Sequence, residues 1–117
     1  MIDTSRIKSF VVDMCDPISI SKLWANKDLQ EDFDIIIDDG FHDFNSNKCF
    51  LDNSIHKLKS GGFYIIEDLH TNLLPLYYEL IENFKKKYDN FLFEIISNDK
   101  LKSELINNNL LFICKYQ

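Results

Sequence analysis

The chain has 117 residues, of which 45% are apolar and 27% charged, and its formal net charge is −6. This length suits one globular domain, and the acidic balance excludes a protein that binds nucleic-acid phosphates through a basic surface. No apolar run approaches the ~20 residues of a membrane span and no leader precedes one, so the sequence predicts a cytoplasmic protein without membrane or nucleic-acid partners. The cysteines form no CxxC pair and are expected to be buried free thiols (Cys15, Cys49 and Cys114).

The first half of the chain predicts two strands and two helices. A β-rich run at Ile7–Met14 is expected to form a strand, and Pro17 then opens a helix, because proline is tolerated in a first turn. The nearly continuous apolar run Phe33–Ile37 indicates a strand that is covered on both faces. From Asp43 to Lys59 apolar side chains recur at helical spacing, and the sequence Ser60-Gly61-Gly62 is expected to end this helix.

The second half predicts a strand, a long helix and a final strand pair. Phe63–Ile66 is a second buried strand, and Leu73–Tyr88 follows it as an amphipathic helix. The segment between the last strands, Phe91–Ser97 and Leu110–Tyr116, is too short for a crossover helix, so we expect these two to pair antiparallel. The alternation of strands and helices predicts an α/β domain with a parallel sheet, helices on both faces and right-handed crossovers.

Acidic pairs follow the two buried strands. Asp38 and Asp39 end the strand at 33–37, and Glu67 and Asp68 end the strand at 63–66. Ligands of parallel sheets bind beyond the carboxyl ends of the strands, where we expect the four acids to gather. Carboxylate oxygens suit Mg²⁺ or another divalent cation, so three of them are the candidate metal ligands (Asp39, Glu67 and Asp68), with the fourth acid a possible addition. The alternative is that one member of each pair caps the following helix.

Two histidines follow these acids closely. His42, three residues after Asp39, is positioned to act as a general base beside a metal-bound hydroxyl. The alternative is that His42 has no catalytic role and is a surface or helix-capping residue. His70, two residues after Asp68, is a candidate substrate contact, as is Asp38.

The stretches FDIIIDDGFHD (residues 33–43) and KSGGFYIIEDLHT (residues 59–71) resemble the C-terminal half of the metal-dependent class I S-adenosylmethionine O-methyltransferases. The group is that of the macrocin and mycinamicin sugar O-methyltransferases, with the cephalosporin-hydroxylase-like proteins as relatives. The resemblance implies a three-layer Rossmann-like sheet. It also implies that Asp39, Glu67 and Asp68 hold Mg²⁺, which orients and acidifies a sugar hydroxyl, and that His42 takes the proton of that hydroxyl.

The resemblance implies a cofactor contact as well. The segment VVDMCD would approach the adenine of S-adenosylmethionine, with Asp16, or as a weaker candidate Asp13, as the contact. A helix cap ahead of Pro17 is an equal alternative for Asp16.

The sequence departs from the family pattern in four ways. Phe41 stands where the family has serine before the histidine, and Ser46 stands where a second histidine is often found. No GxGxxG motif is present, and the first two strands of the family fold are missing. The expectation is therefore one partial methyltransferase-like domain over residues 1–117, truncated at the N-terminus.

Two functions remain open at this level. One is an O-methyltransferase, or its C-terminal half, that uses Mg²⁺, a saccharide or other small-molecule acceptor, and S-adenosylmethionine once the cofactor half is supplied. The other is a non-catalytic metal-binding or structural remnant of the same fold, which leaves open whether the isolated chain is an enzyme. Open sheet edges predict a homo-oligomer or association with the missing half. A phosphoacceptor receiver domain is disfavoured, because only one helix separates residues 11–16 from residues 35–40.

Overall fold

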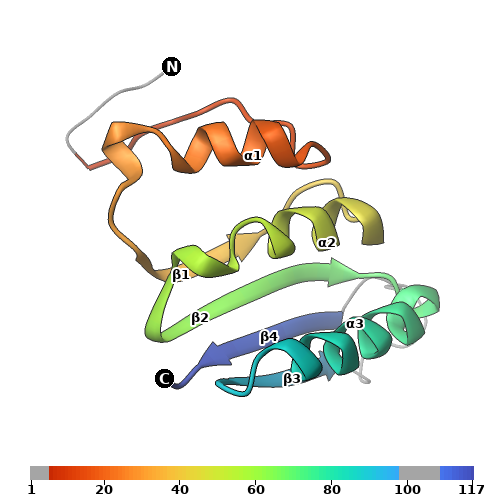
Figure 1. Cartoon of the computed structure of the whole chain (residues 1–117). Coiled ribbons are helices and arrows are strands. Elements are labelled where there is room, and N and C mark those ends of the chain that lie inside the picture. The colour runs from red at the N-terminus through yellow and green to blue at the C-terminus, as the bar shows by residue number, and fades with distance from the viewer. Residues whose placement is uncertain (1–5, 98–108) are drawn as a thin grey trace.

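The computed structural model describes residues 6–97 and 109–117 as a four-stranded sheet with helices (Figure 1). In chain order the elements are α1 (Pro17–Trp24), β1 (Phe33–Asp38), α2 (Phe44–Asp52), β2 (Leu58–Leu69), α3 (Leu74–Lys87), β3 (Phe91–Ser97) and β4 (Asn109–Lys115). Short 3-10 helices cover Lys27–Leu29, Ile55–Lys57 and Thr71–Leu73. None of the helices in the described ranges is long and apolar enough to cross a membrane.

The sheet is mixed, with the strand order β1-β2-β4-β3. β1 and β2 are parallel, and Asp38, the last residue of β1, pairs with Ile66, three residues before β2 ends at Leu69. β4 is antiparallel to both of its neighbours, β2 and β3. The predicted antiparallel pair at the end of the chain is therefore confirmed, while the rest of the sheet is less uniformly parallel than the alternation of elements indicated.

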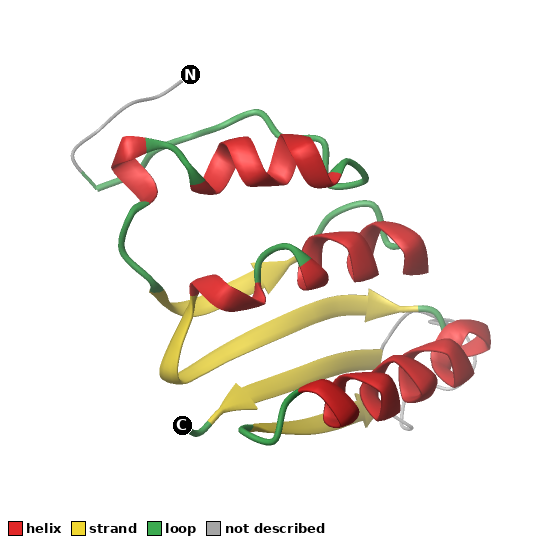
Figure 2. Ribbon diagram, in the orientation of Figure 1, coloured by secondary structure: helices red, strands yellow, loops and turns green. Residues whose placement is uncertain are grey.

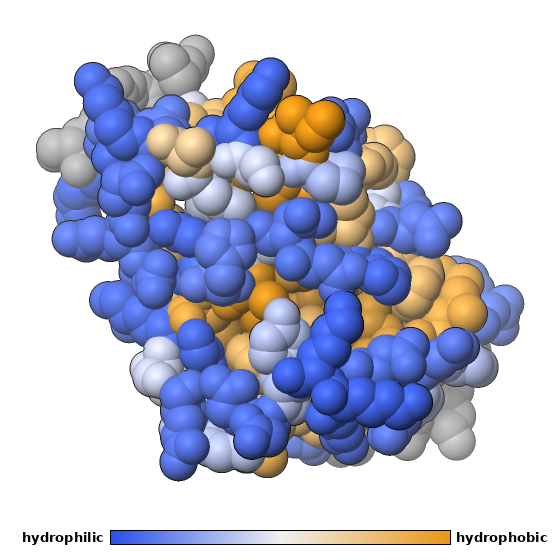
Figure 3. Space-filling view, in the orientation of Figure 1, coloured by the Kyte–Doolittle hydropathy of each residue, from blue (hydrophilic) through white to orange (hydrophobic). Residues whose placement is uncertain are grey.

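The core lies on one face of this sheet. Alternate strand residues point into it, among them Ile36, Tyr64 and Ile113, all of which are buried. α2 and α3 both cover this face (Figure 2), and the ring of Phe44 in α2 packs edge-on against Tyr77 in α3 with centroids 5.0 Å apart. In the same orientation the surface is largely hydrophilic, with apolar groups between the helices and also at the top of the view, in the region of α1 (Figure 3). The α/β class is confirmed.

The prediction of helices on both faces of the sheet, and with it of a three-layer architecture, is wrong for the described residues. β1–α2–β2 and β2–α3–β3 are both crossovers between parallel strands, and both step across the sheet in the same direction. Right-handed crossovers that step in one direction place their helices on the same face. α1 packs beside α2 and the edge of β1, where Trp24 lies against Phe33 and Phe50, and no described helix covers the opposite face.

The predicted strand at Ile7–Met14 is also wrong, because these residues form no strand in the structure. A β-ladder needs a neighbouring strand to satisfy its backbone groups, and β1 pairs with β2 alone among the described residues. The segment instead runs to a turn, where the backbone N–H of Asp13 donates to Ser19 Oγ at 2.8 Å. All three cysteines are free as expected, but none is fully buried: Cys15, in this turn, is exposed, and Cys49 and Cys114 are partly exposed.

The helix predicted from Asp43 to Lys59 is shorter, since α2 ends at Asp52. Ser60-Gly61-Gly62 does not terminate a helix but lies inside β2, which starts at Leu58. Gly61 has φ +82°, and a Cβ on Gly62 would lie 2.8 Å from the carbonyl oxygens of Asp34 and Lys59. The two glycines therefore allow the bend and the close approach of β1 that periodicity alone could not indicate.

Candidate metal and acceptor site

The carboxyl ends of β1 and β2 bring three exposed side chains together. Ligand atoms of Asp39, His42 and Asp68 all lie within 4.8 Å of one another. His42 Nε2 lies 3.9 Å from Asp68 Oδ2. The parallel pairing of the strands explains this meeting, because Asp38 and Ile66 are paired and each is followed closely by a member of the cluster.

Glu67 lies beside the same group. Its pKa is raised above the usual value, first by the negative charge of Asp39 and then by desolvation, a hydrogen bond with Asp39 and the charge of Asp68. The charge of His42 opposes this rise. Carboxylates that raise one another's pKa repel each other, and a bound cation removes that repulsion. The structure thus gathers the three predicted metal ligands at one edge; their role as ligands stays a prediction.

The backbone of this edge has an unusual conformation. Phe41, His42 and Asp68 have φ values of 30°, 49° and 57°. Such positive values are uncommon for residues other than glycine, and they concentrate at functional sites. Sequence reasoning missed this feature, because no glycine marks these positions.

The start of α2 fixes the loop that carries His42. Asp43 is the N-cap of α2 and accepts hydrogen bonds from the backbone N–H of Ser46 at 3.0 Å and from its hydroxyl at 2.7 Å. These bonds lower the pKa of the Asp43 carboxyl. Ser46 Oγ also lies 2.9 Å from the Cys15 thiol. The cap therefore holds one end of the loop while β1 holds the other.

Asp38 lies apart from the exposed cluster. It is 3% exposed, its Oδ1 accepts the backbone N–H of Gly40 at 3.2 Å, and burial raises its pKa. It lines a small cavity of about 180 Å³ together with Met14, Gly40 and Phe50. Its other oxygen, Oδ2, is buried without a hydrogen-bond partner, and the roles of Asp38 as a further metal ligand or a substrate contact stay predictions.

The other predicted site residues have local hydrogen-bonding roles. His70 Nδ1 accepts the backbone N–H of Asn72 at 3.1 Å and caps a 3-10 helix. Asp16 Oδ1 accepts from the N–H of Ile18 at 3.0 Å and caps α1, while Asp13 Oδ1 accepts from Cys15 at 2.9 Å. The capping alternative for Asp16 is thus observed. The substrate and cofactor contacts of these residues stay predictions.

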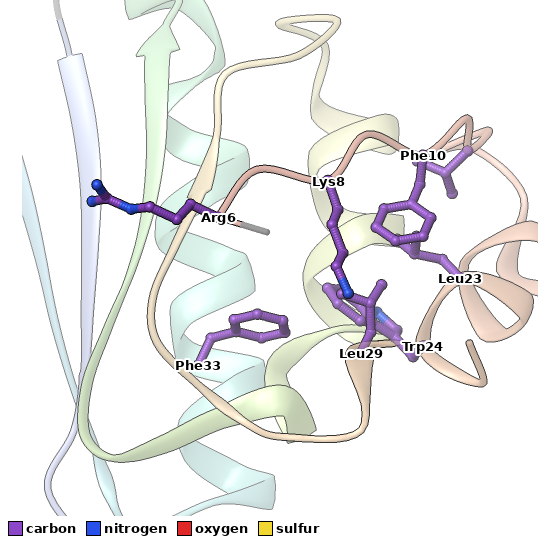
Figure 4. Close-up of a pocket in the computed structure, with 8 residues that line it drawn as sticks. Arg6, Lys8, Phe10, Leu23, Trp24, Leu29 and Phe33 are labelled. Carbon is purple, nitrogen blue, oxygen red and sulfur yellow. The ribbon is translucent and has the colours of Figure 1, made fainter. Parts of the chain in front are cut away.

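A larger cavity, of about 440 Å³, lies near the start of β1, roughly 20 Å of strand away from the acidic edge. Figure 4 shows Phe10, Trp24 and Phe33 around it, with Lys8 running between them. The ammonium of Lys8 lies 3.4 Å from the Asp28 carboxylate. This cavity shares no lining residue with the cluster at the acidic edge.

Comparison with known proteins places this geometry in context. No family model matches the sequence. The chain is 33% identical over 72 residues to 8-demethyl-8-alpha-L-rhamnosyl tetracenomycin-C 2'-O-methyltransferase of Streptomyces olivaceus, a match that covers 62% of this chain and 18% of that protein.

The fold has solved counterparts. The MycE methyltransferase from the mycinamycin biosynthetic pathway, solved with Mg and SAH, superposes with a TM-score of 0.67 at 20% identity over 97% of this chain and 34% of MycE. Its complex with Mg, SAH and mycinamycin VI gives 0.65 at 19% identity over 97% of this chain and 33% of MycE. The chain thus spans about a third of MycE and under a fifth of the Streptomyces enzyme. The resemblance to the sugar O-methyltransferase group that the sequence indicated is confirmed, by sequence similarity to one such enzyme and by a fold shared with MycE.

Proposed function

We propose that this chain is the metal- and acceptor-binding part of a Mg²⁺-dependent, S-adenosylmethionine-dependent O-methyltransferase that acts on a sugar hydroxyl. The observation that carries the proposal is the convergence of Asp39, His42 and Asp68 within 4.8 Å at adjoining strand ends. Support comes from the relatives, of which one methylates the 2' oxygen of a rhamnosyl compound by its name and another was solved with Mg, SAH and mycinamycin VI.

The residues present fit a Mg²⁺ ion. Asp39, Glu67 and Asp68 offer hard oxygen donors, and the negative charges of Asp39 and Asp68 both raise the pKa of Glu67. Mg²⁺ in proteins is usually held by one or two carboxylates with several waters, which leaves positions for a substrate hydroxyl. A cation bound there would orient and acidify that hydroxyl.

His42 would receive the proton of the acceptor hydroxyl. Its imidazole is exposed at the same edge, and Nε2 lies 3.9 Å from Asp68 Oδ2, so the base would stand beside the proposed metal ligands. Phe41, whose side chain is 74% exposed next to His42, offers an apolar ring against which a sugar could lie. Oxygen, proton and base would thereby be brought to one place, and the acceptor oxygen would be left free to attack the methyl donor.

The cofactor site needs more than these residues. The cavity beside Asp39 measures about 180 Å³, whereas small-molecule sites usually enclose about 300 to 1,000 Å³. We therefore propose that a further stretch of polypeptide completes the S-adenosylmethionine site, with Asp16 or Asp13 contributing from this chain.

Calorimetric titration tests the proposal. We expect this chain to bind Mg²⁺, and Asp39→Asn or Asp68→Asn to weaken that binding at least about tenfold because each removes one carboxylate ligand. The matched control is Asp34→Asn, at the other end of β1, which should bind Mg²⁺ like the wild type.

Cofactor titration separates the parts of the proposal. S-adenosylhomocysteine should bind this chain weakly or not at all, with or without Mg²⁺. Micromolar binding to this chain alone would show that no further polypeptide is needed. A chain that binds no Mg²⁺ would instead contradict the metal-dependent function itself.

A further inference from the structure

Strand β2 has an irregular register with β4 at the residues that carry its acids. Ile66 pairs with Leu111 of β4 and Leu69 pairs with Asn109, so three steps along β2 are matched by two along β4. The extra residue lies at Glu67-Asp68. One extra residue on one strand of an antiparallel pair is a β-bulge, a feature that redirects side chains and is frequent beside active sites.

The bulge explains why two successive acids reach the same edge. In a regular strand the side chains of Glu67 and Asp68 would point to opposite faces. Here both lie beside Asp39: Glu67 shares a hydrogen bond with it, and a carboxylate oxygen of Asp68 lies within 4.8 Å of its ligand atom. The positive φ of Asp68, 57°, belongs to the same departure from strand geometry. The arrangement of the acids therefore depends on what holds the bulge.

The side chain of Asn109 holds the far end of the bulge. It is 4% exposed and stands at the start of β4, the strand between β2 and β3. Its amide nitrogen donates to the carbonyl of Leu69 at 2.9 Å and to Thr71 Oγ1 at 3.1 Å, and its amide oxygen accepts from Ser97 Oγ at 2.5 Å. The Leu69 carbonyl can only accept, which fixes the nitrogen on that side. Both polar atoms of this buried amide therefore have partners.

We propose that Asn109 is a positioning residue of the Mg²⁺ site: its side chain holds the chain after Asp68, so that the Asp68 carboxylate stays beside Asp39 and His42. The inference rests on the proposed function for the role of the metal. The hydrogen bonds that it uses lie within this chain and can be tested without the metal.

Two anchors determine the conformation of Asp68. On its amino side, Ile66 pairs with both β1 and β4. On its carboxyl side, Leu69 and Asn109 form the last pair of the β2–β4 ladder among the described residues, and the Asn109 amide adds its bond to the Leu69 carbonyl there. A residue other than glycine keeps a positive φ only where its surroundings impose it. Without the second anchor, Asp68 returns to an extended conformation and its carboxylate leaves the cluster.

Mg²⁺ titration of the whole chain by calorimetry tests the inference. Asn109→Leu keeps the branched shape of asparagine but forms no hydrogen bond, and it should lower the affinity for Mg²⁺ about tenfold, the usual cost of losing a partner behind the ligands. Asn109→Ala, which removes the amide without adding volume, should have the same effect and serves if the leucine variant does not fold. Urea unfolding shows which variants are folded.

Two controls separate position from stability. Ser97→Ala removes a hydrogen bond of the same amide but leaves its bonds to Leu69 and Thr71, so it should change the Mg²⁺ affinity by less than about twofold. Lys57→Met removes a part-buried hydrogen bond at the opposite end of β2. It should lower stability and leave the Mg²⁺ affinity unchanged, because its effect is remote from the acids.

A double substitution shows whether Asn109 acts through Asp68. In the background of Asp68→Asn, Asn109→Leu should change the Mg²⁺ affinity by less than about twofold, because the carboxylate that it positions is already gone. A general structural role would instead lower the affinity by the same factor in both backgrounds.

Nuclear magnetic resonance in the presence of a chelator reports the backbone itself. The three-bond coupling between the amide and α protons of Asp68 depends on φ, and Asn109→Leu should move it from the value of a positive φ to that of an extended strand. Ser97→Ala should leave this coupling unchanged.

The inference requires that the Mg²⁺ affinity and the Asp68 coupling change together in Asn109→Leu. Either change without the other overturns it, as does an equal loss of affinity in the Asp68→Asn background. A wild type that binds no Mg²⁺ contradicts the proposed function instead. The Asp68 coupling then decides by itself whether Asn109 positions this residue.

Discussion

His42 Nε2 and Asp68 Oδ2 lie 3.9 Å apart across the ends of two neighbouring parallel strands, and both residues hold a positive φ. For a residue other than glycine, this conformation costs about 1–3 kcal/mol. The pairing of β1 with β2 and the cap of α2 impose it on them, and it turns both side chains to the same edge. The site is therefore held by the fold at some cost to stability.

Replacement of Asp68 should reveal that cost. Asp68→Gly should be more stable than Asp68→Ala by about 1 kcal/mol, because glycine adopts φ +57° without the clash that a Cβ creates. Urea unfolding in the presence of a chelator measures the difference. Equal stability of the two variants would show that the backbone relaxes at this position. Both variants should bind Mg²⁺ weakly, since both lack the carboxylate.

Loss of the imidazole at position 42 should affect proton transfer and leave the metal in place. Under the proposed function, and with the polypeptide that completes the cofactor site supplied, His42→Ala should lower turnover by about 10²- to 10⁴-fold, the usual contribution of a general base. Its affinity for Mg²⁺ should change by less than about threefold, because the carboxylates remain. A parallel loss of Mg²⁺ affinity would show that His42 is a ligand instead.

The pKa of Glu67 predicts a pH dependence of stability. Its folded-state pKa is raised, chiefly by Asp39, so the folded chain binds this proton more tightly than the unfolded chain does. The stabilisation is fully present below the unfolded value near 4.5 and is lost as the pH rises through the raised value. In chelator, the free energy of unfolding of the wild type should therefore fall, relative to Glu67→Gln, as the pH rises through this window.

Urea unfolding at a series of pH values measures that difference. Saturating Mg²⁺ should remove or reverse it, because the cation offsets the charge of Asp39. A difference that is the same at every pH would contradict the assigned cause of the shift.

Lys57 lies directly before β2, and its side chain contacts the loop that precedes β1. Its side chain is 8% exposed, and its ammonium donates to the carbonyl of Leu29 at 2.8 Å and lies 3.7 Å from Asp32. It also lies 5.9 Å from the ring centroid of Trp24. Lys57→Met should lower the free energy of unfolding by about 1–3 kcal/mol, because it leaves the part-buried carbonyl of Leu29 without its donor.

Thermal unfolding measures this loss. The matched control is Lys59→Met, whose half-exposed ammonium pairs with Asp34 at the surface and should change stability by less than about 0.5 kcal/mol. If both substitutions cost the same, the buried network around Lys57 contributes little.

The sequence alone was enough to locate β1 and β2, which pair with each other, and the acidic residues that follow their apolar runs. The apolar runs at Phe33–Ile37 and Phe63–Ile66 predicted β1 and the centre of β2, and the acids that follow them lie together because parallel strands end at the same edge. These features depend on residues close together in the chain, so a local pattern can indicate them.

Tertiary structure alone decided the rest. Ile7–Met14 has the composition of a strand but no neighbouring strand among the described residues, and a ladder cannot form from one side. The positive φ of His42 and Asp68 comes from the meeting of β1, β2 and α2 rather than from their residue types. The apolar runs indicated cover on both faces, but the direction of two crossovers placed both helices on one. A local pattern shows that a side chain avoids water, whereas only the path of the chain through space decides what covers it.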